Sequence, residues 1–214
     1  MKNKLLDLIR EWAERNHYVL LARGKNPQAF IVGESHRDPK LIAEQGELVD
    51  IVKPGFILHE LMETLIYAPK TKELKLAPGR AYNSYDADAH SRILDYAVNW
   101  ADKHQASLIG CDLSMQEMNN CFKEIAKRYP KKYHYDEESD EVYPIEGSLK
   151  STNQESRIFS FREAQMGKTI LEYAKRSSKP VVAVVGAYHI RPRAKIHAVM
   201  KKADYWCIDQ TSIV

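Results

Sequence analysis

Short apolar runs alternate along the chain with longer segments in which apolar and charged positions recur at helical spacing. Strands are predicted at 17–22, 30–33, 56–59, 107–111, 181–185 and 205–208, and helices at 38–52, 60–67, 81–104, 114–128, 153–176 and 194–202. Strands that are separated by one or two helices are typical of a mainly parallel central sheet flanked by helices on both faces. We therefore predict a single α/β domain over residues 1–214.

One segment, at about 130–152, breaks this alternation. It carries the acidic run 136–141 among Tyr133, Tyr135 and Tyr143, and it lacks a clear helix or strand pattern. A long loop of this kind in a compact domain is usually functional or disordered. We interpret it as a polar acidic insertion, and both a lid over a site and a solvated surface segment stay open.

Composition and charge narrow the function classes. The hydrophobic content of 44% argues against a disordered chain, and a net charge of +3 without a dense Lys/Arg stripe argues against nucleic-acid binding. No apolar run approaches the ~20 residues of a membrane span. The apolar positions of the first segment, Leu5, Leu6, Ile9 and Trp12, are spaced for one face of a docked helix. The three cysteines form no CxxC pair, which favours reduced thiols and a cytoplasmic location.

Two of the apolar runs end in the same short phrase, a glycine followed three residues later by a histidine. The first phrase leads through Gly33 to His36, and the second leads through Gly186 to His189. In an open α/β sheet, ligands gather beyond the carboxyl ends of the strands. The two imidazoles therefore predict an active site at that edge of the sheet.

Other polar residues follow the predicted strands and belong to the same hypothesis. Glu34 ends the first run, His59 and Glu60 end the second, and Asp112 ends the third. Imidazole and carboxylate groups are ligands of zinc or manganese, and they equally supply a general base with an orienting carboxylate. The structural alternatives are a carboxylate at a helix N-terminus for Glu60 and a helix cap for Asp112.

The predicted helix 153–176 brings further charge toward the second histidine through Arg162 and Glu163. Arginine binds carboxylate or phosphate in a fork, although a solvated helix face would carry the same charges. The glycine-rich nucleotide loops, the Gly-x-Ser-x-Gly elbow and the His-Glu-x-x-His helix are all absent from the sequence.

Together these motifs resemble a superfamily that contains the erythromycin esterases, the TraB/PrgY pheromone-shutdown proteins, the Tiki proteases and the haem-binding ChaN-like proteins. The matching phrases are IVGESH (31–36), FILHELME (56–63), LIGCD (108–112), FREAQMGKTI (161–170) and VVAVVGAYH (181–189). The resemblance implies a pocket with a core of Glu34, His36, Glu60 and His189, and with Arg162 nearby as an anion or oxyanion partner. His59, Asp112 and Glu163 are secondary candidates.

This resemblance implies a hydrolase that cleaves an ester or amide bond in a small molecule or peptide. In a Tiki-like mechanism, His36, His189 and Glu60 bind a divalent metal (Mn, Zn or Co). In an esterase-like mechanism, His36 is the base on water and Arg162 stabilises the developing charge. Glu34 or Glu60 acts as general base or orients an imidazole.

Two alternatives stay open. The first is a non-catalytic protein that binds haem or another small ligand, through His36 or His189 in the case of haem. The second is an interaction protein that acts through the insertion at 130–152.

Overall fold

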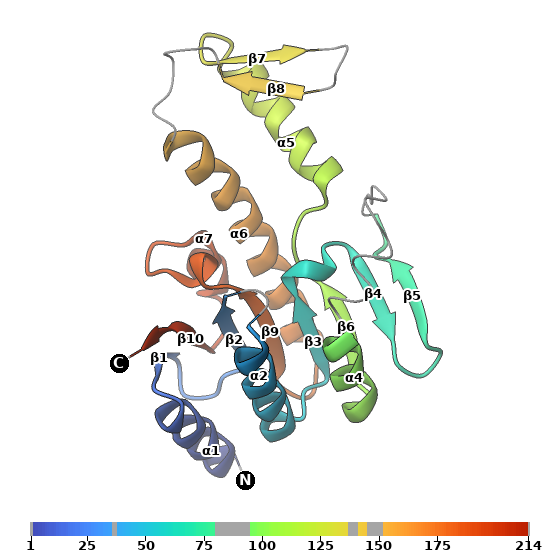
Figure 1. The fold of residues 1–214 in the computed structure, drawn as a ribbon, viewed down its shortest axis with the longest axis vertical. Helices are drawn as coiled ribbons and strands as arrows, with labels where there is room; N and C mark the ends of the chain where they lie inside the picture. Colours follow the sequence, from blue (N-terminus) through green and yellow to red (C-terminus); the bar gives the residue numbers. More distant parts are fainter. Residues whose placement is uncertain (1, 36–37, 80–94, 137–140, 145–151, 214) are drawn as a thin grey trace.

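An eight-stranded sheet forms the centre of the molecule in the computed structural model (Figure 1). The structure describes residues 2–35, 38–79, 95–136, 141–144 and 152–213. Across the sheet the strands lie in the order β1 (Tyr18–Arg23), β10 (Tyr205–Ile213), β2 (Ala29–Glu34), β9 (Val181–Gly186), β3 (Phe56–His59), β6 (Ser107–Gly110), β4 (Leu65–Ala68) and β5 (Glu73–Leu76).

The five strands in the middle of this order are parallel to one another. The pairs β10–β2, β2–β9, β9–β3 and β3–β6 are all parallel, whereas β1, β4 and β5 pair antiparallel at the two edges. All six residues of β2 are buried, as expected for a parallel strand covered on both faces. The predicted mainly parallel sheet is confirmed.

Helices cover both faces of the sheet, also as predicted. On one face lie α1 (Lys2–Arg15), α2 (Pro39–Val52) and α4 (Asp95–His104), packed against Phe30 and Val32 of β2. On the other face lie α6 (Thr152–Arg176) and α7 (Lys195–Met200), packed against Ile31. Successive side chains of a strand point to opposite faces, so β2 supplies both cores.

The segment 60–67 differs from the predicted helix. Only the 3₁₀ turn η1 (Glu60–Met62) forms, and β4 follows it. Glu63 has φ 47°, a left-handed conformation that ends the turn. The run Leu65–Ala68 then pairs with β6 and β5, because its aliphatic and aromatic side chains suit a half-buried strand. The predicted loop 68–80 likewise contains β5.

The acidic insertion also contains secondary structure. β7 (Tyr133–Asp136) and β8 (Glu141–Pro144) form an antiparallel hairpin, which lies with α5 (Met115–Arg128) away from the central sheet (Figure 1). Tyr133 packs on Ile125 and Ala126 of α5. The prediction of a segment without strands is therefore wrong for these residues. Residues 137–140 and 145–151 lie outside the described ranges, so a lid or partner-binding role of the insertion stays a prediction.

The observed helix starts agree with the predicted ones where the sequence contains a capping residue. Asp38 caps α2, with Pro39 at its first position, and Ser114 and Glu117 form a reciprocal capping box at α5. Of the predicted helix 81–104, only the part from Asp95 is described. Within the described part of the chain, no helix combines the length and apolar character needed to cross a membrane.

Candidate functional site

A pocket of about 580 Å³ lies at the carboxyl ends of β2 and β9, the edge of the sheet at which the sequence places the site. Its volume is in the range of small-molecule binding sites, roughly 300–1,000 Å³. The residues that line it come from six elements and their connections: Glu34, Ser35, Glu60, Arg162, Gly186, Ala187, Tyr188, His189, Arg191, Asp209 and Thr211.

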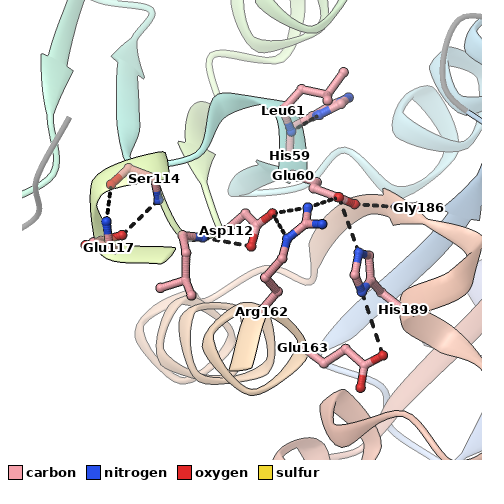
Figure 2. A network of polar contacts seen from close by, with 11 residues as sticks. His59, Glu60, Leu61, Asp112, Ser114, Glu117, Arg162, Glu163, Gly186 and His189 are labelled. Carbon is pink, nitrogen blue, oxygen red and sulfur yellow. Dashed lines mark hydrogen bonds and ion pairs between the residues drawn. The ribbon is translucent and has the colours of Figure 1, made fainter. Parts of the chain in front are cut away.

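Arg162 of α6 joins two buried carboxylates beside the pocket (Figure 2). Its Nη2 lies 2.5 Å from Glu60 Oε1, its Nε donates to Asp112 Oδ2 at 2.8 Å, and Nη2 also contacts this Asp112 oxygen. Burial lowers the pKa of Arg162, but the carboxylates of Asp112 and Glu60 raise it by more than burial lowers it. The guanidinium therefore stays charged. Burial raises the pKa of Asp112 by more than Arg162 lowers it.

His189 is almost fully buried and lies between the carboxylates of Glu60 and Glu163 (Figure 2). Its Nε2 is 3.3 Å from Glu60 Oε1, and its Nδ1 is 3.8 Å from Glu163 Oε1. Burial lowers the pKa of His189, but the carboxylates of Glu163 and Glu60 outweigh this and raise it to about 9. The imidazole therefore carries its second proton at neutral pH.

Glu60 is the residue that both cations share. Its Oε2 accepts a hydrogen bond from the backbone N–H of Gly186 at 2.5 Å. Burial raises the pKa of Glu60, but His189, the Gly186 N–H and Arg162 together lower it to about 2. Glu60 is thus an ionised carboxylate that connects β3, α6 and the end of β9.

Glu163 connects the ring of His189 with the start of α7. Its second oxygen accepts the backbone N–H of Lys195 at 2.7 Å, at the first residue of α7. His189 lies in the 3₁₀ turn η2 (Ala187–Ile190), which packs close to the end of β2. A Cβ atom at Gly33 would collide with Ile190, so the glycine of the first phrase makes room for the turn of the second.

Glu34 and His59 point to the opposite face of the sheet. Glu34 Oε2 accepts from Gln45 Nε2 at 2.9 Å, and Gln45 also donates to Gln210 at 2.8 Å. His59 is fully buried; its Nδ1 accepts the N–H of Leu61, and its Nε2 lies 2.8 Å from the Tyr96 hydroxyl. Glu34 reaches the pocket lining, whereas His59 does not.

The predicted metal set of His36, His189 and Glu60 is only partly described, because His36 lies outside the described residues. Over the described ranges, no three His, Cys, Asp or Glu side chains are arranged to hold a metal ion. The two described members pair with each other, and a protonated imidazole has no lone pair for a metal. These two residues, as arranged, do not fit a metal site.

The lining also contains Tyr188, Arg191, Asp209 and Thr211, which the sequence did not indicate as candidates. Tyr188 is 64% exposed, and the Arg191 guanidinium lies 4.5 Å from the centre of its ring. Arg191 Nε also donates to the Tyr188 carbonyl oxygen at 2.9 Å. Asp209 and Thr211 reach the pocket because β10 continues beyond its predicted end at 208. Tyr188 belongs to the second phrase, immediately before its histidine, and that position was the available signal.

Comparison with known proteins finds a distant structural likeness. No family model matches the chain, and no curated protein matches it. Among solved structures, the chain is similar to ChaN of Campylobacter jejuni, in a structure described as showing cofacial haem binding. The identity is 12%, the match covers 94% of this chain and 90% of that chain, and the TM-score is 0.49.

Proposed function

We propose that this protein binds a small planar anion in the pocket at the ends of β2 and β9, and that haem is the ligand to test. The observation that carries this proposal is the Tyr188–Arg191 pair in the pocket lining. A tyrosine side chain is an established axial ligand of haem iron, and an arginine fork suits a propionate carboxylate. The resemblance of the motifs to ChaN-like proteins favours haem among planar anions.

The surroundings of Tyr188 support its role as iron ligand over that of His189. Tyr188 is 64% exposed, whereas His189 is 2% exposed and lies between Glu60 and Glu163. With its pKa raised to about 9, the imidazole holds a proton where iron would need a lone pair. We therefore assign iron binding to Tyr188 and a supporting role to His189.

Haem, when bound, supplies a redox-active iron centre. The chain would supply a phenol for that iron at Tyr188 and a cation at Arg191, and the paired charges of Glu60, Arg162 and His189 line the same pocket. Arg162 is bonded to Glu60 and Asp112, so it connects the ends of β3 and β6 with α6. A lining that is held in place before the ligand arrives limits the cost of ordering it on binding.

The test is a titration of the purified protein with ferric haem, followed at the Soret band. We expect a saturable red-shifted band with the wild-type chain, a loss of at least tenfold in affinity for Tyr188→Phe, and a loss of about threefold to tenfold for Arg191→Gln. Tyr129→Phe is the matched control, because Tyr129 is exposed but does not line this pocket. A flat titration, or equal spectra for wild type and Tyr188→Phe, would overturn the proposal.

A second candidate, hydrolysis of an ester or amide bond, is favoured by the shifted pKa values of Glu60 and His189. Strongly shifted groups in a pocket are candidates for catalysis. As an imidazolium, His189 suits proton donation to a leaving group, with Arg162 next to it as a fixed positive charge. The base on water would be Glu34 or His36.

This candidate is tested with a panel of p-nitrophenyl esters and short peptides. Turnover that is lost in His189→Gln and kept in Tyr188→Phe would support hydrolysis. The first variant changes the charged network and the second changes only the residue proposed to bind haem iron. Absence of turnover across the panel, or full activity in a folded His189→Gln variant, would count against it.

A further inference from the structure

A second and larger cavity lies between α5 and α6, outside the pocket described above. It has a volume of about 810 Å³. Its lining is Asn120, Cys121, Glu124, Ile125, Arg128, Tyr129, Ser160, Phe161, Ala164 and Lys195. The α5 residues recur at intervals of three and four, so they form one face of that helix, turned toward α6. Figure 1 shows these two helices diverging from the sheet toward the β7–β8 hairpin.

The walls of this groove are largely apolar, although they lie at the surface. Phe161 of α6 is 44% exposed and Tyr129 at the end of α5 is 38% exposed. Cys121, Ile125 and Ala164 continue the apolar surface between them. Exposed apolar side chains that gather in one concave place indicate a binding surface.

Two cations border the same groove. Arg128 is at the last position of α5, and Lys195 is at the first position of α7. Over the described ranges, neither side chain has an ion-pair partner. The one acidic residue of the lining, Glu124, lies 3.3 Å from Lys127 Nζ, which offsets its charge. The groove therefore combines an apolar floor with a surplus of positive charge at its border.

We propose that this groove binds an amphipathic monoanion of the fatty-acid type. The alkyl chain would lie along Phe161 and Ile125, and the carboxylate would meet Arg128 or Lys195. Charge complementarity argues for an anion rather than a neutral or cationic amphiphile. At roughly 30 Å³ for each group of water size, a chain of a dozen carbons takes up less than half of the cavity, so the volume accommodates it. This inference does not depend on the function proposed for the Tyr188 pocket.

The experiment compares three amphiphiles of equal length, laurate, dodecanol and dodecylammonium, by calorimetry on the full chain. We expect laurate to bind at least tenfold more tightly than dodecylammonium. Shortening the fatty acid should weaken binding by about threefold to fourfold for each methylene removed. Arg128→Gln and Lys195→Gln should each weaken laurate binding by about twofold to fivefold, because exposed ion pairs contribute modestly.

Lys201→Gln is the matched control, since Lys201 follows the end of α7 and does not line the groove. Arg191→Gln reports on binding in the other pocket. Laurate binding that is unchanged in both groove variants, or weakened only by Arg191→Gln, would overturn the proposal. Equal affinities for all three amphiphiles would do the same. Phe161→Ala, checked for folding by circular dichroism, should weaken all three ligands together if the floor is the apolar contact.

Discussion

His189 holds its proton between two carboxylates, and this arrangement determines how stability depends on pH. Its pKa rises from 6.5 to about 9 on folding, so its contribution is complete below pH 6.5 and is lost as the pH rises toward 9. The pKa of Glu60 falls from 4.5 to about 2, so its contribution is complete above pH 4.5 and is lost as the pH falls toward 2. The pair therefore stabilises the fold most between pH 4.5 and 6.5.

We predict that His189→Gln removes the alkaline part of this dependence. In the wild-type chain, the free energy of unfolding should fall by about 2–3 kcal/mol between pH 6.5 and 9 through His189, since a shift of one pKa unit corresponds to about 1.4 kcal/mol. Urea unfolding at a series of pH values measures this for both chains. Parallel pH curves for the two would mean that His189 is not a stabilising cation.

The sequence predicted which residues belong to this network, but it did not predict how they pair with one another. Glu60, Asp112, Arg162, Glu163 and His189 were all candidates, because polar residues at strand ends are few and easily recognised. The pairing of Arg162 with Glu60 and Asp112 depends on how α6 lies across the strand ends. That is a long-range contact between residues 162, 60 and 112, which no local pattern encodes. The protonated state of His189 likewise depends on long-range contacts, those of its ring with Glu60 and Glu163.

At the scale of the elements, the turn η1 packs closely against the backbone of β6. A Cβ atom at Gly110 of β6 would collide with the backbone carbonyl groups of Met62 and Glu63. Those two residues lie two and three positions after Glu60, at the end of the same short turn, so we expect a shift there to reach the carboxylate that pairs with Arg162 and His189.

We predict that Gly110→Ala lowers the free energy of unfolding by about 1–3 kcal/mol, because backbone atoms cannot move aside as a side chain can. Gly33→Ala is the comparison, since its new methyl group would first meet the flexible end of the Ile190 side chain. Chemical denaturation of both variants should show the larger loss for Gly110→Ala. An equal or larger loss for Gly33→Ala would contradict this explanation.

The elements also show where local pattern stops being decisive. The central strands and the caps at Asp38 and Ser114 were predicted because burial and capping leave clear local signals. The segment 60–67 was predicted as helix because its apolar spacing suits either structure over so few residues. Leu65–Ala68 forms a strand instead, because it pairs with β6 at the edge of the parallel strands. β5 escaped prediction because all four of its residues are exposed.

At the scale of the whole molecule, the topology brings together the two strands that lead into the Gly-x-x-His phrases. β2 and β9 are neighbouring parallel strands, with Glu34 paired to Gly186, so Gly33 and Gly186 lie at the same edge of the sheet although they are far apart in sequence. The parallel order predicted this edge as the site. The second cavity lay beyond prediction, because it depends on how α5 and α6 lie next to each other, which is a contact between distant parts of the sequence.

The most direct test of ligand binding at the Tyr188 pocket is the electron paramagnetic resonance spectrum of the ferric haem complex, recorded for wild type and Tyr188→Phe. Haem held by a tyrosine oxygen should give a high-spin signal that disappears or changes in Tyr188→Phe. A low-spin spectrum typical of two nitrogen ligands, or one spectrum shared by both chains, would contradict the assignment of Tyr188 as the iron ligand.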